Sequence, residues 1–246
     1  MPSFFQRAAT VARTRIDAAR RRRGLSVPVG SVDLGDLRRS EPISRVFGLD
    51  RGTPIDRYYI EGFLEANARR IRGRVLEVGD RTYTERFGGT AVAQSDVLHL
   101  TGDSPQATIV ADLTDAPEIA DGSFDCVILT QALQFMYSME AAVSELHRIL
   151  RPGGCVLCTV PGISQISRFD MDLWGDYWRL TSRSAKELFE TAFCTGDVHV
   201  ETHGNVLAAT AFLHGLAVGE LSRSELDVHD DDYQLIVAIR AVKALA

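Results

Sequence analysis

One segment, residues 124–160, constrains the fold of this chain more than any other. It reads FDCVILTQALQFMYSMEAAVSELHRILRPGGCVLCTV: an apolar run, an amphipathic helix pattern, an Arg-Pro-Gly-Gly turn and a second apolar run. This order predicts a strand, a helix, a tight turn and a parallel strand. The polar pair Thr130-Gln131 then stands at the end of the first strand. Because ligands bind outside the carboxyl ends of strands in open α/β sheets, the pair marks a candidate binding edge.

The alternation of strands and helices continues on both sides of this segment. Further strands are predicted over residues 75–78, 91–98, 107–111, 197–202 and 233–242, and helices over residues 55–71, 184–193 and 205–221. Ser184 can cap the second of these helices, with Glu187 at capping-box spacing. The short connection between residues 98 and 107 argues against a full helix there. Such alternation predicts right-handed crossovers and a doubly wound α/β sheet with helices on both faces.

Charge is spread unevenly along the chain. The formal net charge is −6, yet residues 1–25 hold seven arginines and one aspartate and so carry +6, which leaves −12 for the remainder. Because phosphate contact needs a basic surface, we do not expect nucleic acid as a partner. We find no run long enough to span a membrane and no apolar signal-peptide centre near the N-terminus. The expected location is therefore cytoplasmic.

The N-terminal residues 1–25 have apolar side chains at helical spacing between their arginines. A helix of this kind can lie on an anionic membrane or meet a phosphate-rich substrate. We favour a solvated helix that packs on its own domain or on a partner subunit, which leaves both peripheral membrane contact and a homo-oligomer open. Residues 24–54 are rich in Gly, Pro and Ser and predict irregular chain. We therefore divide the chain into an N-terminal extension, residues 1–50, and one α/β domain, residues 51–246.

Metal and redox sites are not expected. Cys155 and Cys158 form a C-x-x-C pattern, but side chains three residues apart on a strand point to opposite faces, so we interpret both as buried structural thiols. His199 and His203 have H-x-x-x-H spacing without the glutamate of zinc proteases. The acidic run after His229 is interpreted as a solvated turn rather than a magnesium site.

The opening segment resembles the fourth strand, helix and fifth strand of class I S-adenosylmethionine-dependent methyltransferases. In that family a strand of the form FDxVxxxxxLxx and an LxPGG turn recur in this order. The matching residues are Phe124, Asp125, Val127, Leu133, Leu150, Pro152, Gly153 and Gly154. The resemblance implies a Rossmann-like sheet of seven mostly parallel strands, with the last antiparallel. It also implies that residues 51–246 are a methyltransferase domain and that S-adenosylmethionine is the cofactor.

The resemblance further implies positions for the cofactor. In the family, the first strand leads into a glycine turn, where backbone can approach the ligand and helix amides can accept its carboxylate. An acidic residue after the second strand binds the ribose hydroxyls, which Asp96 matches, with His99 close by. The Asp after the third strand, here Asp112, receives the adenine amino group. The residues assigned to cofactor binding are Glu77, Gly79, Asp80, Asp96, Val97, Asp112, Leu113, Thr130 and Gln131.

One turn departs from the family pattern. The usual G-x-G-x-G is replaced by residues 79–83, Gly-Asp-Arg-Thr-Tyr, so Arg81 stands at the second glycine. Its side chain adds bulk and positive charge beside a sulfonium cofactor. Two alternatives stay open: the loop takes another path, or cofactor binding is weaker.

Aromatic and acidic residues gather after the fifth strand, in residues 161–181. Aromatic faces that stack on sugar rings and carboxylates that accept hydroxyl hydrogen bonds suit a carbohydrate; a partly buried loop that ties the last helix to the sheet is the alternative. The strings over residues 47–60 and 174–179 resemble a methyltransferase subgroup associated with bacterial polysaccharide and glycoside biosynthesis. The residues assigned to the substrate are Arg57, Tyr58, Trp174, Tyr177, Trp178 and Arg179.

The predicted activity is therefore transfer of a methyl group to a hydroxyl of a saccharide or a glycosylated small molecule. A sugar hydroxyl is a poor nucleophile, so a general base is useful. Our candidates are Asp170 and Asp172, with Tyr58 or Tyr137 as a positioning hydroxyl. Two alternatives are a methyltransferase for a carboxylate or amine on a non-sugar metabolite, and a non-catalytic scaffold with the same fold.

Overall fold

The computed structural model describes residues 27–194 and 196–245. The chain divides into two units, Met1–Glu41 and Pro42–Ala246. The predicted N-terminal basic helix lies outside the described residues. The described part of the first unit is irregular chain with one 3₁₀ turn, Gly35–Leu37, and the sheet belongs to the second unit.

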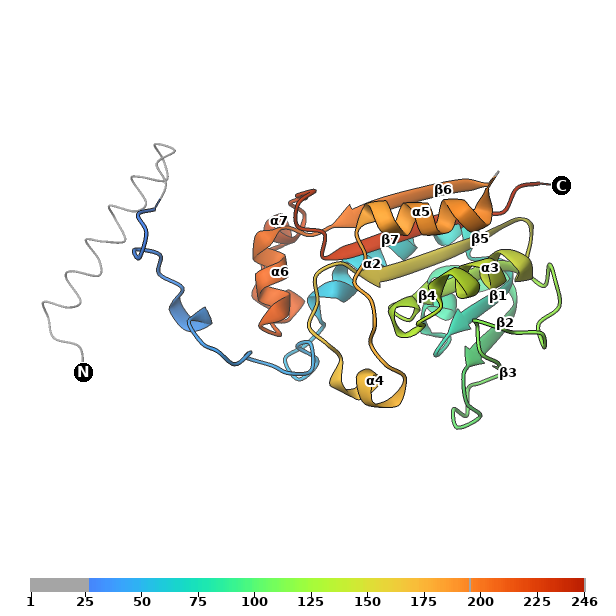
Figure 1. The fold of residues 1–246 in the computed structure, drawn as a ribbon, viewed down its shortest axis with the longest axis horizontal. Coiled ribbons are helices and arrows are strands. Elements are labelled where there is room, and N and C mark those ends of the chain that lie inside the picture. The colour runs from blue at the N-terminus through green and yellow to red at the C-terminus, as the bar shows by residue number, and fades with distance from the viewer. Residues whose placement is uncertain (1–26, 195, 246) are drawn as a thin grey trace, which may run out of the picture. The chain divides into compact units, whose positions relative to one another are not determined.

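A seven-stranded sheet organises the second unit (Figure 1). Its strands are β1 (Gly73–Val78), β2 (Val92–His99), β3 (Ile109–Val110), β4 (Phe124–Thr130), β5 (Leu150–Pro161), β6 (Asp197–His203) and β7 (Ile236–Val242). They follow the order β3-β2-β1-β4-β5-β7-β6, in which β7 runs antiparallel to both of its neighbours and the other pairs are parallel. The predicted Rossmann-like sheet with an antiparallel last strand is confirmed.

Helices cover both faces of this sheet, as predicted. In Figure 1, α3 (Met139–Ile149) and α5 (Ser182–Phe193) lie in front of the sheet and α2 (Ile55–Ala66) lies behind it. The core clusters agree, since α3 and α5 pack on one face and α2 and α6 (Val206–Leu213) on the other. Strands buried on both faces read as continuous apolar runs, which is why β4 and β5 carried the strongest signal. Cys155 and Cys158 point to opposite faces, both buried, as the strand pattern predicted.

An aspartate ties the amino ends of the three central strands together. Asp125 on β4 accepts hydrogen bonds from the backbone N–H of Arg74, 2.7 Å away on β1, and from Nη1 of Arg151, 2.6 Å away on β5. Burial works against the ionised carboxyl, yet these two donors hold the pKa of Asp125 below its ordinary value. The preceding Phe124 is fully buried, with the Arg74 guanidinium over its ring. The Phe-Asp pair of the sequence motif is therefore structural.

Several predicted boundaries differ from the structure. The Arg-Pro-Gly-Gly turn is an irregular part of β5, because Phe124 pairs with Leu150 and Cys126 already pairs with Cys155. The helix expected over residues 205–221 stops at Leu213, and only a 3₁₀ turn, Val218–Glu220, follows. The helix expected over residues 55–71 ends at Ala66. No α-helix lies between β2 and β3 among the described residues, as predicted.

The start of α5 also differs from the prediction. The helix begins at Ser182, and its cap is Thr181 rather than Ser184. The Thr181 side chain accepts from the backbone N–H of Ser184, and Oγ of Ser184 accepts from the backbone N–H of Thr181 in return. Glu187 instead pairs with Arg183 one turn away. Thr181 and Ser184, three residues apart, can both cap a helix, and α5 starts after Thr181.

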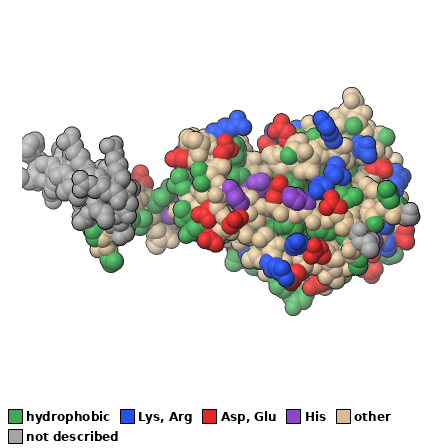
Figure 2. All heavy atoms as spheres, turned by 90° about the horizontal axis from the view of Figure 1, so that it is seen from above, with side chains coloured by type: hydrophobic (Ala, Val, Ile, Leu, Met, Phe, Trp, Pro, Cys, Tyr) green, Lys and Arg blue, Asp and Glu red, His purple; other side chains and the backbone are tan. Residues whose placement is uncertain are grey.

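The edge strand β6 carries alternating polar side chains. Figure 2 views the molecule from this side and shows histidine side chains among acidic and basic ones. On β6, Glu201 lies between His199 and His203 and within ion-pair distance of both. The two imidazoles favour the ionised carboxylate of Glu201 more than burial opposes it. The pKa of Glu201 is therefore lowered, chiefly by His203. Charged side chains on an exposed edge discourage pairing with another sheet.

Membrane-spanning helices do not occur in the described part of the chain, where no helix is both long and apolar enough to cross a bilayer.

We expect Gly162→Ala to destabilise the protein by about 1–3 kcal/mol, because overpacking of a closed site forces backbone shifts. Gly162 follows β5, and a Cβ there would overlap the carbonyl oxygen of Gln234 and lie 3.2 Å from that of Leu180. The control is Gly62→Ala inside α2, where a Cβ meets nothing within 4 Å. That change should be neutral or stabilise by about 0.5–1 kcal/mol. Urea unfolding of both variants checks the pair, and equal stability would show that the chain at Gly162 can move away from Gln234.

Candidate cofactor and acceptor site

Two cavities adjoin at the carboxyl end of β4. The first, which we call the strand-end pocket, has a volume of about 400 Å³ and is lined by the ends of β1 and β2 and by the segments after β3 and β4. The second, the cap pocket, has a volume of about 500 Å³ and is lined by the start of α2, the end of β4 and the segment after β5. Phe135 lines both. The two cavities therefore share a wall.

The strand-end pocket combines apolar walls with a bare turn and a carboxylate. Leu98, Leu113 and Phe135 form apolar parts of its lining. Gly79 lines it with φ 101°, a conformation that a side chain would strain, and an added Cβ would meet no atom within 4 Å. Asp112 Oδ1 accepts from the backbone N–H and the hydroxyl of Thr114, at 2.9 Å and 2.7 Å, which fixes the carboxylate at the pocket wall. These groups fit a flat heteroaromatic ring with an amino group, such as adenine.

In the described residues, the helical chain after the glycine turn is short and irregular. Residues Thr84–Gly88 form a five-residue π-helix and Gly89–Ala91 a 3₁₀ turn before β2 begins. The buried carboxylate of Glu77 takes the place of a ligand, because it accepts from the backbone N–H groups of Tyr83 at 3.1 Å and Thr84 at 2.7 Å. Burial raises the pKa of Glu77 and these amide bonds oppose the rise. Glu77 therefore shapes the turn from within, and the two amides are not free to hold a cofactor carboxylate.

Arg81, the departure from the family's glycine pattern, does not enter the strand-end pocket. Its guanidinium reaches the backbone oxygen of Gln106 at 3.4 Å, and Arg81 is not among the residues that line the cavity. The path of the loop thus keeps the Arg81 guanidinium out of this cavity. Asp80 is exposed and accepts only from the backbone N–H of Thr82 among the described residues.

The predicted position of Asp96 at the end of its strand is wrong. β2 continues to His99, and Asp96 lies beside Leu76 in the register, 6% exposed. Its carboxylate binds Nε of Arg74 at 2.7 Å and the hydroxyl of Thr108 at 3.2 Å, and it does not line the pocket. Val97 is fully buried. The side chains that β2 brings to the strand-end pocket are Leu98 and His99.

The remaining predicted residues divide between the two pockets. Thr130 and Gln131 line the cap pocket, together with Arg57, Asp170 and Arg179. The strand-end pocket receives the aromatic residues Tyr137, Trp174 and Tyr177, of which Tyr137 packs edge-on against Tyr177 with 5.3 Å between ring centroids. Trp178 packs against the core behind them. Asp172 is exposed, lies 3.4 Å from Arg168 and lines neither pocket.

The cap segment is held by a buried ion pair. Asp176 accepts from Nη1 of Arg179 at 2.5 Å, from Nη2 at 2.8 Å and from the backbone N–H of Ser167 at 3.0 Å. Burial works against the ionised form, but the guanidinium and the amide lower the pKa of Asp176. The carboxylate of Asp170 accepts from the Ser167 hydroxyl. The segment is thus preorganised by its own charged groups.

Two polar side chains that line the cap pocket were not predicted from the sequence. Asp56 in α2 and Gln134 after β4 are 8% and 5% exposed. Asp56 Oδ1 and Gln134 Oε1 are buried without a hydrogen-bond partner among the described residues. The resemblance had marked residues 47–60, which include Asp56, but no local pattern shows that one carboxyl oxygen is buried and unpaired.

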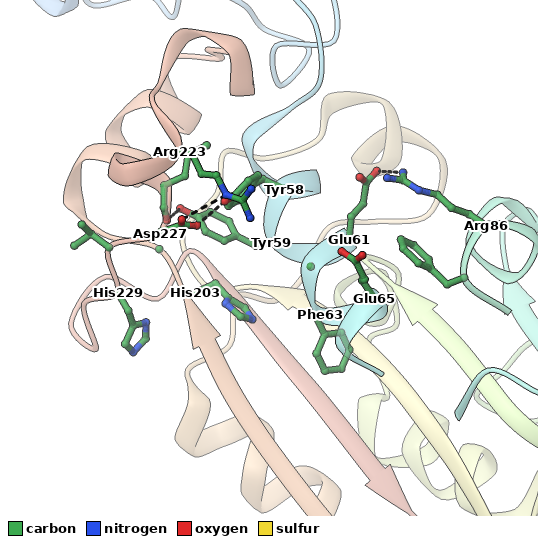
Figure 3. Close-up of a pocket in the computed structure, with 15 residues that line it drawn as sticks. Tyr58, Tyr59, Glu61, Phe63, Glu65, Arg86, His203, Arg223, Asp227 and His229 are labelled. Carbon is green, nitrogen blue, oxygen red and sulfur yellow. Dashed lines mark hydrogen bonds and ion pairs between the residues drawn. The ribbon is translucent and has the colours of Figure 1, made fainter. Parts of the chain in front are cut away.

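A third cavity, of about 430 Å³, lies between α2 and α7 (Arg223–Leu226) and holds Tyr58 (Figure 3). Tyr58 donates its hydroxyl proton to Asp227, and burial raises the pKa of the neighbouring Tyr59 to about 12. The structure therefore separates Tyr58 from the other predicted substrate residues. The reason is helical geometry, since successive residues such as Arg57 and Tyr58 point about 100° apart. Within the described residues no group of three or more His, Cys, Asp or Glu could hold a metal ion.

We expect Asp96→Ala to lower the free energy of unfolding by about 1–3 kcal/mol, because it leaves the Arg74 guanidinium without its carboxylate. Calorimetric affinity for S-adenosylmethionine should stay within twofold of the wild type. The control is Asp197→Ala, which breaks the ion pair between Asp197 and Arg240. The Asp197 side chain is 63% exposed, so this substitution should lower the free energy of unfolding by less than about 1 kcal/mol. A large loss of cofactor affinity in Asp96→Ala would restore the ribose assignment.

Comparison with known proteins agrees with this geometry. A family model described as a methyltransferase domain matches residues 89–158. A relative from Mycolicibacterium smegmatis, described as a probable S-adenosylmethionine-dependent methyltransferase, is 30% identical over 195 residues that cover 72% of this chain and 74% of the relative. The fold is similar to that of an Archaeoglobus fulgidus SAM-dependent methyltransferase, with a TM-score of 0.51, 12% identity and coverage of 76% and 94% of the two chains. It is also similar to that of Haemonchus contortus phosphoethanolamine N-methyltransferase 2 solved with phosphomonomethylethanolamine and S-adenosylhomocysteine, with a TM-score of 0.51, 18% identity and coverage of 81% and 56%. The chain thus belongs to the S-adenosylmethionine-dependent methyltransferase family, and S-adenosylmethionine is its cofactor.

Proposed function

We propose that the cofactor binds in the strand-end pocket and that a hydroxyl of a saccharide or glycosylated small molecule is methylated from the cap pocket. The observation that supports this assignment best is that Phe135 lines both cavities. Methyl transfer requires donor and acceptor to be aligned across a short gap. Residues 51–246 form the catalytic domain in this proposal, with residues 42–50 packed beside them, for example through the Phe47 and Phe212 rings.

Bound S-adenosylmethionine supplies an electrophilic methyl group on a sulfonium. Gly79 allows the backbone of the turn to approach the cofactor, and Asp112 accepts from its adenine amino group. His99 lies at the wall where the family's ribose-binding residue would act. Because Glu77 accepts from the backbone N–H groups of Tyr83 and Thr84, other donors would hold the amino-acid carboxylate of the cofactor.

A hydroxylated acceptor is favoured by the polar groups of the cap pocket. Gln131 and Gln134 offer amides, Asp170 a carboxylate and Arg179 a guanidinium on a preorganised segment. The aromatic wall of Tyr137, Trp174 and Tyr177 borders the neighbouring pocket, where it can also shield the transferred methyl group from water. This mixture of planar donors, acceptors and aromatic faces suits sugar rings better than a purely apolar metabolite.

The direct test is a methyl-transfer assay with isotope-labelled S-adenosylmethionine and a panel of methyl glycosides. We expect a labelled methyl ether and S-adenosylhomocysteine in equal amounts, detected by mass spectrometry. The panel should also contain aromatic carboxylates and primary amines of similar size. Transfer to those compounds alone would contradict the proposal and support the non-sugar alternative.

The cofactor assignment predicts that Gly79→Val weakens S-adenosylmethionine binding at least tenfold. The substitution places a branched side chain at φ 101° and into the strand-end pocket. Gly102→Val is the matched control, because it lies in the loop after β2 with an unstrained φ and nothing within 4 Å of its Cβ. Calorimetry with S-adenosylhomocysteine measures both, and thermal unfolding confirms that both variants fold. Equal affinities in the two variants would move the cofactor elsewhere.

A further inference from the structure

Asp56 has the surroundings of a functional carboxylate rather than a structural one. It is the second residue of α2, lines the cap pocket and is 8% exposed. Its Oδ2 lies 3.2 Å from Nη1 of Arg57, while Oδ1 is buried without a partner among the described residues. An unpaired buried oxygen of an ionised group is costly unless a ligand satisfies it.

The surroundings of Asp56 disfavour the ionised form of its carboxyl group. Burial raises the pKa of Asp56, and the Arg57 guanidinium and the backbone amides at the start of α2 offset only part of the rise. An aspartate in the first turn of a helix normally gains from the helix dipole. Here the effect of burial on the pKa of Asp56 is the largest one.

The other carboxylates of the cap pocket are already engaged. Asp176 is bound by Arg179 and Ser167, and Asp170 accepts from the Ser167 hydroxyl. Gln134 also lines the cap pocket, and its Oε1, like Oδ1 of Asp56, is buried without a hydrogen-bond partner among the described residues. Both atoms are hydrogen-bond acceptors, so a ligand that satisfies them has to bring two donors.

We propose that Asp56 is the general base for the acceptor and that Gln134 accepts a hydrogen bond from a second hydroxyl, so the acceptor is a polyol such as a sugar ring. This inference rests on the proposed function. The hydroxyl oxygen forms a bond to the methyl carbon as the carbon–sulfur bond breaks and its electron pair stays on sulfur. The hydroxyl proton passes to Asp56 and then to solvent. The product is a methyl ether, and the sulfonium charge is lost.

Several charged and titratable groups lie around Asp56. Arg57 lies in the same helix, and Tyr83 approaches from the turn after β1. The cap pocket adds Arg45, Arg168, Asp170, Asp176 and Arg179. A base of raised pKa lies closer to neutral pH than an exposed aspartate, which favours proton transfer at the pH of the cell.

The first test needs no acceptor and uses Asp56→Asn in the full chain. The folded-state pKa lies above the unfolded value of about 3.9, so ionisation costs stability, and that cost grows as pH rises from the unfolded to the folded pKa. Asp56→Asn should therefore melt about 2–4 °C higher than the wild type at pH 7, with the difference vanishing near pH 4. Glu140→Gln, at the second position of α3 and exposed, should melt at or slightly below the wild-type temperature. A lower melting temperature for Asp56→Asn would overturn the inference, because it would make Asp56 a structural helix residue.

The second test measures transfer to the methyl glycosides of the panel. Asp56→Asn should slow transfer at least about 100-fold with KM within threefold, and it should remove the acidic limb of the pH–rate profile. Gln134→Met should raise KM instead, because it deletes an acceptor while preserving shape. A rate for Asp56→Asn within threefold of the wild type would exclude Asp56 as the base. If the wild type methylates no glycoside, the proposed function fails on its own, and the melting comparison still decides whether Asp56 is a strained or a structural group.

Discussion

The rest of the structure depends on the burial of β4 on both faces. Val127, Ile128 and Leu129 are fully buried between the two helical layers, so the strand can carry reactive groups only where it ends. There Gln131 turns into the left-handed region with φ 50°, and its backbone N–H makes a last link to Thr159 on β5 at 2.8 Å. The chain that follows supplies walls to both pockets. Their adjacency is thus a direct result of how the central strand stops.

Two buried carboxylates near this edge show how partners decide the role of a charge. Glu77 is almost inaccessible, yet both of its oxygens accept backbone N–H groups, and it serves to fold a turn that has no α-helix. Asp56 is buried to a similar degree, but one of its oxygens has no partner in the described structure. The same desolvation therefore produces a structural group in one case and a group that awaits a ligand in the other.

The fold was predictable because its signals are local. Apolar runs of strand length, an amphipathic helix and a glycine turn specify the element types without knowledge of their neighbours. The positions of Gly79 and Asp112 beside the strand-end pocket were predictable because both residues follow the end of a strand. Asp96 was misplaced because it lies three residues before the end of β2, which keeps its side chain about 10 Å from the edge. Tyr58 failed because one residue along a helix changes the direction of a side chain by more than a quarter turn.

The sequence by itself determined the order of strands and helices, their burial on two faces and the kinship with S-adenosylmethionine-dependent methyltransferases. Only the tertiary structure decided which buried carboxylates have hydrogen-bond or ion-pair partners and which one has an oxygen without a partner among the described residues. Asp96 pairs with Arg74, Asp176 pairs with Arg179, and Glu77 accepts hydrogen bonds from turn amides. One oxygen of Asp56, beside the cap pocket, has no partner in the described residues. The physical reason is that a carboxylate's state depends on its desolvation and on donors within about 3 Å, and both are fixed only once the chain has folded.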